Sequence, residues 1–188
     1  MTEITDDRKP LPLAIERFVL HWGEMGGNWG VNRSVSQMHA LLYLSERPLT
    51  AEEIADTLGL ARSNVSNSIK ELLAWNLIRR VPIRGDRRDH FEAETDVWEV
   101  FTRIAAGRKE REIDPAIAVL KACASDAERD AAVPAVARDR LKDMLSFMEM
   151  MERFYMQMLA VPKPQIATAI KLGAKVLTFL PGAKRKQA

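Results

Sequence analysis

The sequence has little of what secreted and membrane proteins need. It contains a single cysteine, Cys123, which excludes an internal disulfide and is typical of a reducing compartment. No apolar run is long enough to span a bilayer. The opening residues MTEITDDRKP are acidic and polar, and they lack the basic and apolar regions of a signal peptide. We therefore expect a cytoplasmic protein that does not bind membranes.

Patterns for catalysis and cofactor binding are also missing. The three histidines are widely separated, and no group of His, Cys, Asp and Glu has metal-ligand spacing. The glycine-rich segment WGEMGGNWG (22–30) lacks both the spacing of a dinucleotide-binding loop and the lysine of a P-loop. Cys123 lies among alanines, which favours a small buried hydrophobe over a redox switch. We expect no metal, no cofactor and no enzymatic activity.

Positive charge is concentrated in one stretch of the chain. Residues 61–90 contain seven Lys and Arg against three Asp and Glu, whereas residues 1–60 contain five against nine. The net charge of the whole chain is only +2. A local basic excess of this kind is expected where a protein meets a phosphate backbone.

The first two expected elements are helices. One begins near Leu13 and should end within residues 22–30, because clustered glycines disfavour continued helix. The second runs from near Ser34 to Ser45, with its apolar residues at helical spacing. Its inward residues should be Met38, Leu41 and Leu42.

The next segment has the pattern of a helix-turn-helix. Thr50 and Glu53 form a capping box that opens a short helix, and Gly59 ends it. A further helix follows within three residues, with one apolar face made of Val65, Ile69, Leu72 and Leu73. Two short helices joined by a tight Gly-containing turn are typical of this motif.

A hairpin follows directly. The segment LIRRVPI (77–83) is β-branched and roughly alternating, RGDRRD (84–89) is a polar turn, and HFEAE (90–94) can pair back. The tip is rich in arginine. Helix, helix and hairpin in this order predict a winged helix-turn-helix.

The rest of the chain is expected to be helical. Asp114-Pro115 indicates a kink or a new N-terminus. Ser125 and Glu128 form a second capping-box pattern, opening a helix that reaches about Leu159 with a kink at Pro134. A last amphipathic helix is expected over 164–180. The methionines between 144 and 158 favour packing in a core or dimer interface over an effector pocket.

The predicted fold is therefore mainly α, a winged helix-turn-helix with a two-stranded wing and long N- and C-terminal dimerisation helices. The expected parts are a disordered tail (1–12), the DNA-binding domain with its N-terminal helix (13–95), a helical dimerisation or effector region (96–180) and a flexible basic tail (181–188).

The face of the 61–75 helix opposite its apolar stripe should read DNA. Hydroxyl and amide groups can donate to and accept from base edges and phosphates, and an arginine-tipped wing can reach the minor groove or the backbone. Asp86 could instead clamp one wing arginine. The candidate DNA-binding residues are Arg62, Ser63, Asn64, Ser66, Asn67 and Lys70 on the helix and Arg84, Arg87 and Arg88 on the wing.

The segment TAEEIADTLGLARSNVSNSIKELLAWNLIRRVPIRGDRRDHFEAE resembles the DNA-binding region of MarR-superfamily regulators. The segments FVLHWGEMGGNWGVNRSVSQMHALLYLSERPLT and FTRIAAGRKEREIDP resemble its GbsR-like branch. The resemblance implies a homodimer, joined through N- and C-terminal helices, on a palindromic operator. Ala61 departs from the family, which often has Ser there as the cap of the recognition helix, a difference of about 1 kcal/mol.

Some members of this branch resemble sensors of choline or glycine betaine. A quaternary ammonium effector would need aromatic faces, and the candidates are Trp22, Trp29, Tyr43 and Trp98, although their spacing favours ordinary packing.

We expect a sequence-specific transcriptional regulator, a repressor by family default, that binds double-stranded DNA and is released by a small effector. The alternative is a nucleic-acid architectural or protein-interaction module without operator specificity.

Overall fold

The computed structural model describes residues 11–162, 165–166, 168 and 172–173. The chain forms two compact units that meet between Gly107 and Arg108. None of the described helices is long and apolar enough to cross a bilayer. The helix predicted for 164–180 and the tails predicted for 1–12 and 181–188 lie wholly or mostly outside the described residues.

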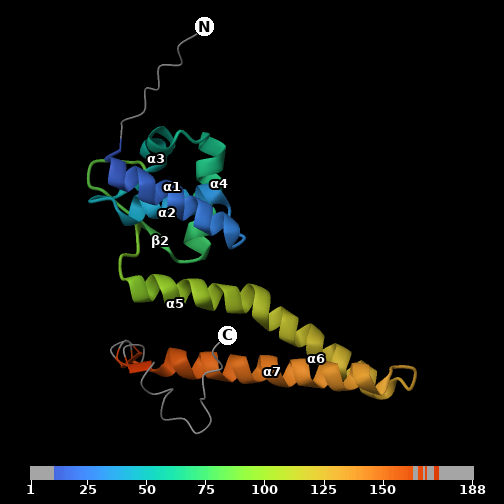
Figure 1. The fold of residues 1–188 in the computed structure, drawn as a ribbon. Coiled ribbons are helices and arrows are strands. Elements are labelled where there is room, and N and C mark those ends of the chain that lie inside the picture. Colours follow the sequence, from blue (N-terminus) through green and yellow to red (C-terminus); the bar gives the residue numbers. More distant parts are fainter. Residues whose placement is uncertain (1–10, 163–164, 167, 169–171, 174–188) are drawn as a thin grey trace. The chain divides into compact units, whose positions relative to one another are not determined.

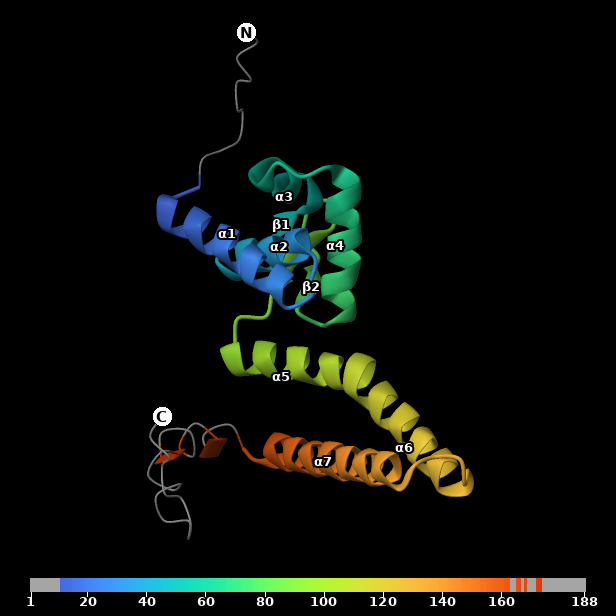
Figure 2. The ribbon, with the colours of Figure 1, turned by 45° about the vertical axis from the view of Figure 1, so that its right-hand side comes forward.

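The first unit is a winged-helix domain, which confirms the predicted mainly α class (Figures 1 and 2). Its sheet has the order β1-β3-β2, with Ile78 opposite Ala93 in the hairpin. The short strand β1, which pairs Leu49 with Phe91, extends the predicted two-stranded wing to three strands. The elements are α1 (Leu13–Asn28), α2 (Arg33–Tyr43), β1 (Leu49–Thr50), α3 (Ala51–Leu58), α4 (Arg62–Ala74), β2 (Ile78–Val81), β3 (His90–Ala93) and α5 (Val97–Arg108).

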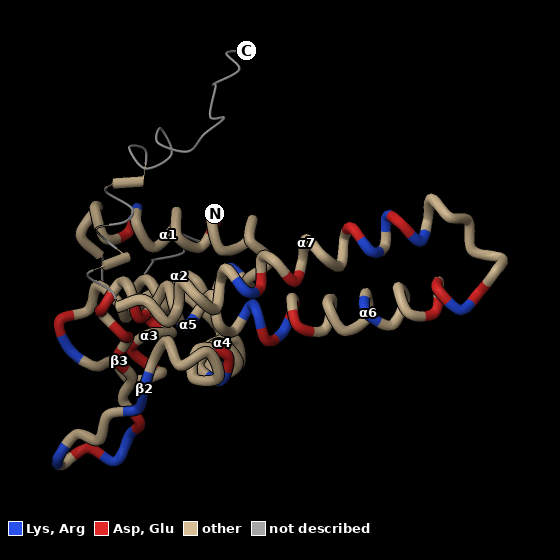
Figure 3. Tube along the Cα trace, turned by 90° about the horizontal axis from the view of Figure 1, so that it is seen from below, with Lys and Arg blue, Asp and Glu red and all other residues tan. Residues whose placement is uncertain are grey.

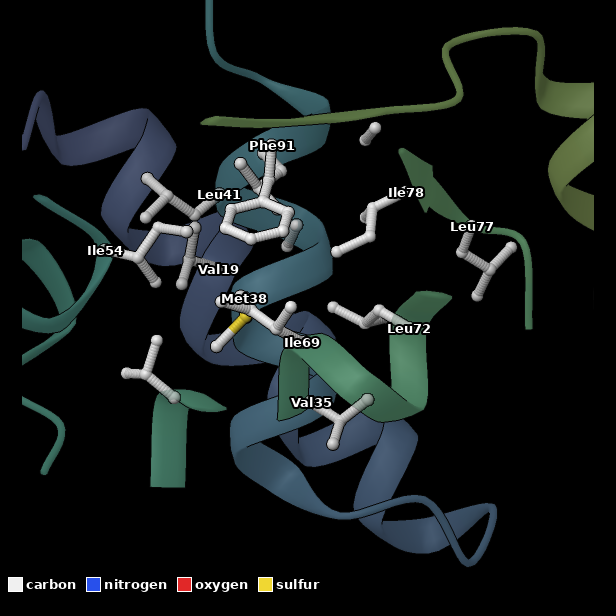
Figure 4. Packing of buried hydrophobic residues seen from close by; sticks show 14 of the residues in the cluster. Val19, Val35, Met38, Leu41, Ile54, Ile69, Leu72, Leu77, Ile78 and Phe91 are labelled. Atoms are coloured by element: carbon white, nitrogen blue, oxygen red, sulfur yellow. The ribbon is translucent and has the colours of Figure 1, made fainter. Parts of the chain in front are cut away.

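Helix α2 lies at the centre of the core. It packs against α1, α3, α4 and β3, and seven of its eleven residues are buried. The predicted inward residues of α2 and α4 are in the core, with Leu73 at its edge (Figure 4). The largest side chains at the centre are Met38, Ile54 and Leu72, each less than 2% exposed. Burial against α2 therefore fixes which face of α4 is left for solvent.

Local sequence signals begin and end helix α3 of the first unit as predicted. The Thr50 hydroxyl accepts from the Glu53 N–H at 3.2 Å, and the Glu53 carboxylate accepts from the Thr50 N–H at 2.8 Å. Gly59 ends α3 with φ of 64°. This capping box satisfies two backbone donors that the helix itself leaves unpaired.

The second unit contains a π-helical turn and two long helices: η1 (Lys109–Ile113), α6 (Asp114–Arg129) and α7 (Ala135–Ala160). Pro115 is at the first turn of α6. Its nitrogen cannot donate to the carbonyl four residues back, and a π-turn is a common way to accommodate such a break.

Three expectations for this unit are wrong. Pro134 is the residue before α7 in a turn, not a kink within a helix, because the chain leaves helical geometry at Asp130 with ψ of 108°. Ser125 and Glu128 lie inside α6, where the backbone donors are already paired within the helix. Cys123 is exposed on α6, although α6 packs against α7.

Helix α1 ends at Asn28, within the predicted segment, but it first continues through Gly23, Gly26 and Gly27. A Cβ on Gly26 would overlap the Ser36 hydroxyl of α2, and one on Gly23 would be 2.5 Å from Gln37 Cγ. The missing side chains let α1 approach α2 closely. The gain in packing offsets the low helix propensity of glycine.

Gly26→Ala and Gly27→Ala should therefore have opposite effects on stability. A Cβ on Gly27 meets nothing within 4 Å, so its replacement should raise the free energy of unfolding by up to about 1 kcal/mol through helix propensity. Gly26→Ala should lower it by roughly 1–3 kcal/mol, because α1 must move away from Ser36. Urea titration measures both. Equal changes in the two variants would contradict the close-packing explanation.

Candidate nucleic-acid interface

One face of α4 is buried and the other is polar and exposed. Arg62, Ser63, Ser66, Asn67 and Lys70 are exposed, as the helical spacing predicts. The buried face holds Val65, Ser68, Ile69 and Leu72. Five of the six candidate residues on this helix are thus accessible to a ligand, and all but two of these five have uncharged polar or hydroxyl groups.

The sixth candidate, Asn64, is half-buried and points toward α2. Its Nδ2 donates to the Ser34 hydroxyl at 2.9 Å, and its Oδ1 lies 3.5 Å from the Ser68 hydroxyl. These contacts hold α4 against the first turn of α2. The geometry therefore makes Asn64 a positioning residue for α4 rather than an open reading group.

Ala61 is the N-cap residue of α4, and its side chain cannot cap the helix. The free N–H groups of a helix N-terminus attract anions, and a phosphate oxygen can occupy the place that a serine hydroxyl takes elsewhere. Arg62 lies beside these groups and is paired with Glu52 of α3 at 2.8 Å. Both partners are largely exposed, so this pair adds little to stability, but the carboxylate lowers the net charge beside Arg62.

Asp86 organises the tip of the wing. Its carboxylate accepts from the Arg88 backbone N–H at 2.9 Å and from the Arg88 guanidinium at 2.6–3.1 Å. These bonds hold the pKa of Asp86 well below its ordinary value. Gly85 turns the chain with φ of 88°, and the Asp86 N–H donates to the Ile83 carbonyl. Asp86 thus clamps one wing arginine, the alternative that the sequence left open.

The other two wing candidates are differently placed. Arg84 and Arg87 are exposed, and within the part of the chain that the structure describes no ion pair or hydrogen bond holds either guanidinium. Figure 3 shows basic and acidic residues close together along this hairpin. Arg84 and Arg87 are therefore the wing cations most readily available to an anionic partner.

Helix α4 and the wing share one hollow on the surface, with a volume of about 400 Å³. Ser66 and Lys70 line it from α4, and Arg80 and Arg88 line it from the hairpin. Glu52 and Asp89 also line it, and Asp89 is 3.7 Å from Arg80. The structure thus brings three candidates, Ser66, Lys70 and Arg88, together with Arg80, which the predicted set omits. Its position inside the basic stretch was the signal that could have found it.

The four aromatic candidates for an effector site lie on different elements. Trp22 stacks on Phe18 with ring centroids 5.3 Å apart, and His39 lies between Trp22 and Tyr43. Trp29 is 61% exposed just beyond the end of α1, whereas Trp98 is half-buried on α5. Trp22 and Tyr43 share one row of rings that packs on the core, as ordinary packing predicts.

The first unit as a whole defines a winged-helix domain, with an uncapped recognition helix and a basic wing around one hollow. Residues 29–89 match the MarR family. The chain is 25% identical over 101 residues to the HTH-type transcriptional repressor GbsR of Bacillus subtilis (strain 168), covering 54% of this chain and 56% of that protein. It is 23% identical over 78 residues to the HTH-type transcriptional repressor OpcR of the same organism, covering 42% of each.

A solved structure, a crystal structure of a transcriptional regulator, is also similar to this chain. Its TM-score is 0.53 at 26% identity, over 75% of this chain and 92% of that chain. The matched part spans about half the length of the curated relatives, whose names describe regulators and not enzymes. The chain is thus similar to MarR-family regulators over residues 29–89, and the curated relatives that it matches include GbsR.

The aromatic row predicts a loss of stability in mild acid. Burial lowers the pKa of His39 from 6.5 to about 4, and its Nε2 has no hydrogen-bond partner among the described residues. The unfolded chain binds this proton near pH 6.5 and the folded chain only near pH 4. Stability should therefore fall as the pH drops through this window, by on the order of 3 kcal/mol.

His39→Leu should remove this part of the pH dependence. Denaturant midpoints between pH 7 and 4 measure it, and His21→Gln, at an exposed position on α1, is the control that should keep the wild-type slope. If His39→Leu has the same slope as the wild type, His39 does not resist protonation in the folded protein.

Proposed function

We propose that this protein is a sequence-specific transcriptional regulator that reads duplex DNA with α4 and its wing. The observation that carries the proposal is the shared hollow, in which polar groups of the recognition helix lie beside arginines of the wing. A helix of this kind enters the major groove with its N-terminal residues on base edges, and the wing reaches the flanking minor groove or backbone.

The exposed groups divide into two roles. Ser63, Ser66 and Asn67 are short, uncharged donors and acceptors, which suit base edges. Arg84 and Arg87 suit phosphates, because a charge that moves freely can follow the backbone. Arg88, fixed by Asp86, is already in one geometry before binding, so it loses less conformational entropy when it meets a groove.

Ion pairing reduces the effective charge of the interface. Four of the seven cations in residues 61–90 have carboxylate partners: Arg62, Arg79, Arg80 and Arg88. Lys70, Arg84 and Arg87 remain, so a dimer offers six cations for phosphate contacts. The slope of log K against log salt should then be about −5, not the roughly −13 that all fourteen cations would give.

A second copy of the chain is the expected partner for the C-terminal unit. Helix α7 has no buried residue, and five of its large apolar side chains are exposed at a spacing of three and four. This spacing forms a single stripe along the helix, typical of a coiled-coil seam. The stripe consists of Met144, Phe147, Met151, Phe154 and Met158.

A dimer would set the spacing of two half-sites on a palindromic operator. Binding across a promoter would block transcription, and the relatives GbsR and OpcR are named as repressors. An effector that binds more tightly when the two recognition helices have another separation would weaken operator binding. The loss of binding free energy can be no larger than the effector's preference for that conformation. The aromatic candidates do not form one cage, so they give a quaternary ammonium effector no particular support.

Selection of bound sequences from a random duplex library tests the proposed function. The expected result is a palindrome with half-sites about one helical turn apart, bound roughly a thousandfold or more tightly than random duplex. The competing function is an architectural module without operator specificity. It predicts no enriched motif and binding that disappears as salt is raised.

Asn67→Ala and Arg87→Ala should separate base reading from phosphate binding. Asn67→Ala should weaken binding to the selected operator by about 1–3 kcal/mol and relax preference at one base pair in each half-site. Arg87→Ala should weaken binding to all sequences alike. It should also reduce the magnitude of the slope of log K against log salt by about 2 for a dimer. Affinities for operator variants at two salt concentrations measure both. If neither variant changes binding, the proposed reading surface is wrong.

Phe147→Glu combined with Phe154→Glu should convert the protein to a monomer. A carboxylate in an apolar seam loses its hydration, so the two stripes should no longer pair. Analytical ultracentrifugation should give twice the 21.2 kDa protomer mass for the wild type and the protomer mass for the double variant. The control is Ser146→Glu with Gln157→Glu, at exposed positions on another side of α7. A double Phe variant that remains dimeric would exclude the stripe as the interface.

A further inference from the structure

The recognition helix and the wing diverge from one place in the fold. Helix α4 ends at Ala74, β2 begins at Ile78, and Ile78 pairs with Ala93 at the end of β3. Residues 75–78 and 93–95 together therefore form the point from which both DNA-reading arms extend. We call this point the vertex.

Arg103 of α5 braces the vertex with a single guanidinium. Its Nη1 donates to the Asn76 carbonyl at 2.5 Å, and its Nη2 donates to the Glu94 carboxylate at 2.8 Å. Its Nε is 3.6 Å from the carboxylate of Glu99, one turn earlier on α5. Arg103 thus joins α5 and the adjacent end of the wing to the end of α4, twenty-seven residues earlier.

The two acceptors are themselves held in place. Asn76 has a left-handed backbone with φ of 55°, and the N–H of Leu77 donates to the Leu72 carbonyl at 3.0 Å, which closes the end of α4. Glu94 accepts from the N–H groups of Thr95 and Asp96 at 3.0 Å each. The bond from Asp96, followed by the charge of Arg103, lowers the pKa of Glu94, so the acceptor stays ionised.

A second contact holds α5 to the same place. A Cβ on Gly107 would be 2.8 Å from the ring of Trp75, so the ring lies directly on the backbone of α5 one turn beyond Arg103. Val100 and Ile104 of the same helix pack on the core. Helix α5 is therefore fixed to the end of the recognition helix by packing, and to the wing through Arg103.

Small rotations at the vertex are amplified at the reading groups. Ile78 and Arg84 are six residues apart, up to roughly 20 Å at the rise of a strand, and Asn76 and Asn67 are nine residues apart, roughly 14 Å at the rise of a helix. A rotation of about 5° at the vertex moves a group 20 Å away by roughly 2 Å, more than a hydrogen bond tolerates. Recognition by both arms at once therefore needs a rigid vertex.

We propose that Arg103 is a positioning residue that fixes the wing relative to the recognition helix and so sets the register in which the two read one site. It acts through Asn76 and Glu94 without contacting DNA. Lysine cannot replace it, because an ammonium lacks the planar fork that meets two acceptors in fixed directions. The inference rests on the proposed DNA-reading function, but its first test needs no DNA.

The first test measures the distance between the recognition helix and the wing in the full chain. Spin labels are placed on Ala61→Cys, before α4, and Ile83→Cys, in the wing, with Cys123→Ala removing the only native thiol. Labelled protein is diluted with unlabelled chain so that distances within one protomer dominate. Arg103→Gln and Arg103→Lys should each broaden the distance distribution. Arg17→Gln, an exposed site on α1, should leave it unchanged.

The second test uses DNA selected by the wild type. Arg103→Gln should lower affinity tenfold or more, with loss of preference at the flanking positions read by the wing and retained preference at the positions read by α4. The salt slope should not change, because no phosphate contact is lost. A variant that was only less well folded would lose preference equally at all positions.

The outcomes separate this inference from the proposed function. A narrow, unchanged distance distribution in both Arg103 variants would overturn the inference, whatever the protein binds. A fall of the salt slope by about 2 for a dimer would also overturn it, since Arg103 would then be a phosphate contact. The wild type could fail to select any sequence while the variants still show broadened distances. That result would refute the proposed operator reading but would support the positioning role of Arg103.

Discussion

The close approach of α1 to α2 is the constraint on which the rest of the first unit depends. Gly23 and Gly26 let the two helices meet with almost no space between them, and this closes one side of the core. Helix α2 can then be buried on its remaining sides by α3, α4 and β3. Because α4 must present Val65, Ile69 and Leu72 to α2, the side chains of Ser63, Ser66 and Asn67 face outward. The polar, exposed face of α4 is thus a consequence of helix packing.

Much of this fold follows from signals that lie within a few residues of one another. The capping box of Thr50 and Glu53, the left-handed Gly59 and the period of α4 each depend on neighbours in sequence, and each was predicted correctly. The errors concern contacts between distant segments. Gly23 and Gly26 stay helical in α1 where α2 lies against them, and Cys123 is exposed although α6 packs against α7. Neither fact is encoded near the residue concerned.

The candidate interface divides in the same way. Helical period alone placed Ser63, Ser66 and Asn67 on the open face of α4. It could not identify Asn64 as a contact of Ser34, thirty residues earlier, because that pairing depends on how α4 crosses α2. The bond from Arg103 to Asn76 spans twenty-seven residues and has no local signature either. Sequence therefore locates the exposed candidate residues better than it locates the residues that hold their helix in place.

The paired charges of the wing bear on how specificity arises. Non-specific attraction to DNA grows with every cation that releases a counterion, and it favours all sequences alike. Carboxylates beside Arg62, Arg80 and Arg88 reduce that attraction, while the short polar groups of α4 remain uncharged. In the proposed complex with DNA, a larger share of the binding free energy must then come from contacts that depend on sequence and on correct geometry. An interface with weak general attraction and two separate reading arms gains from a rigid vertex, because a misplaced arm has little electrostatic attraction to compensate for it.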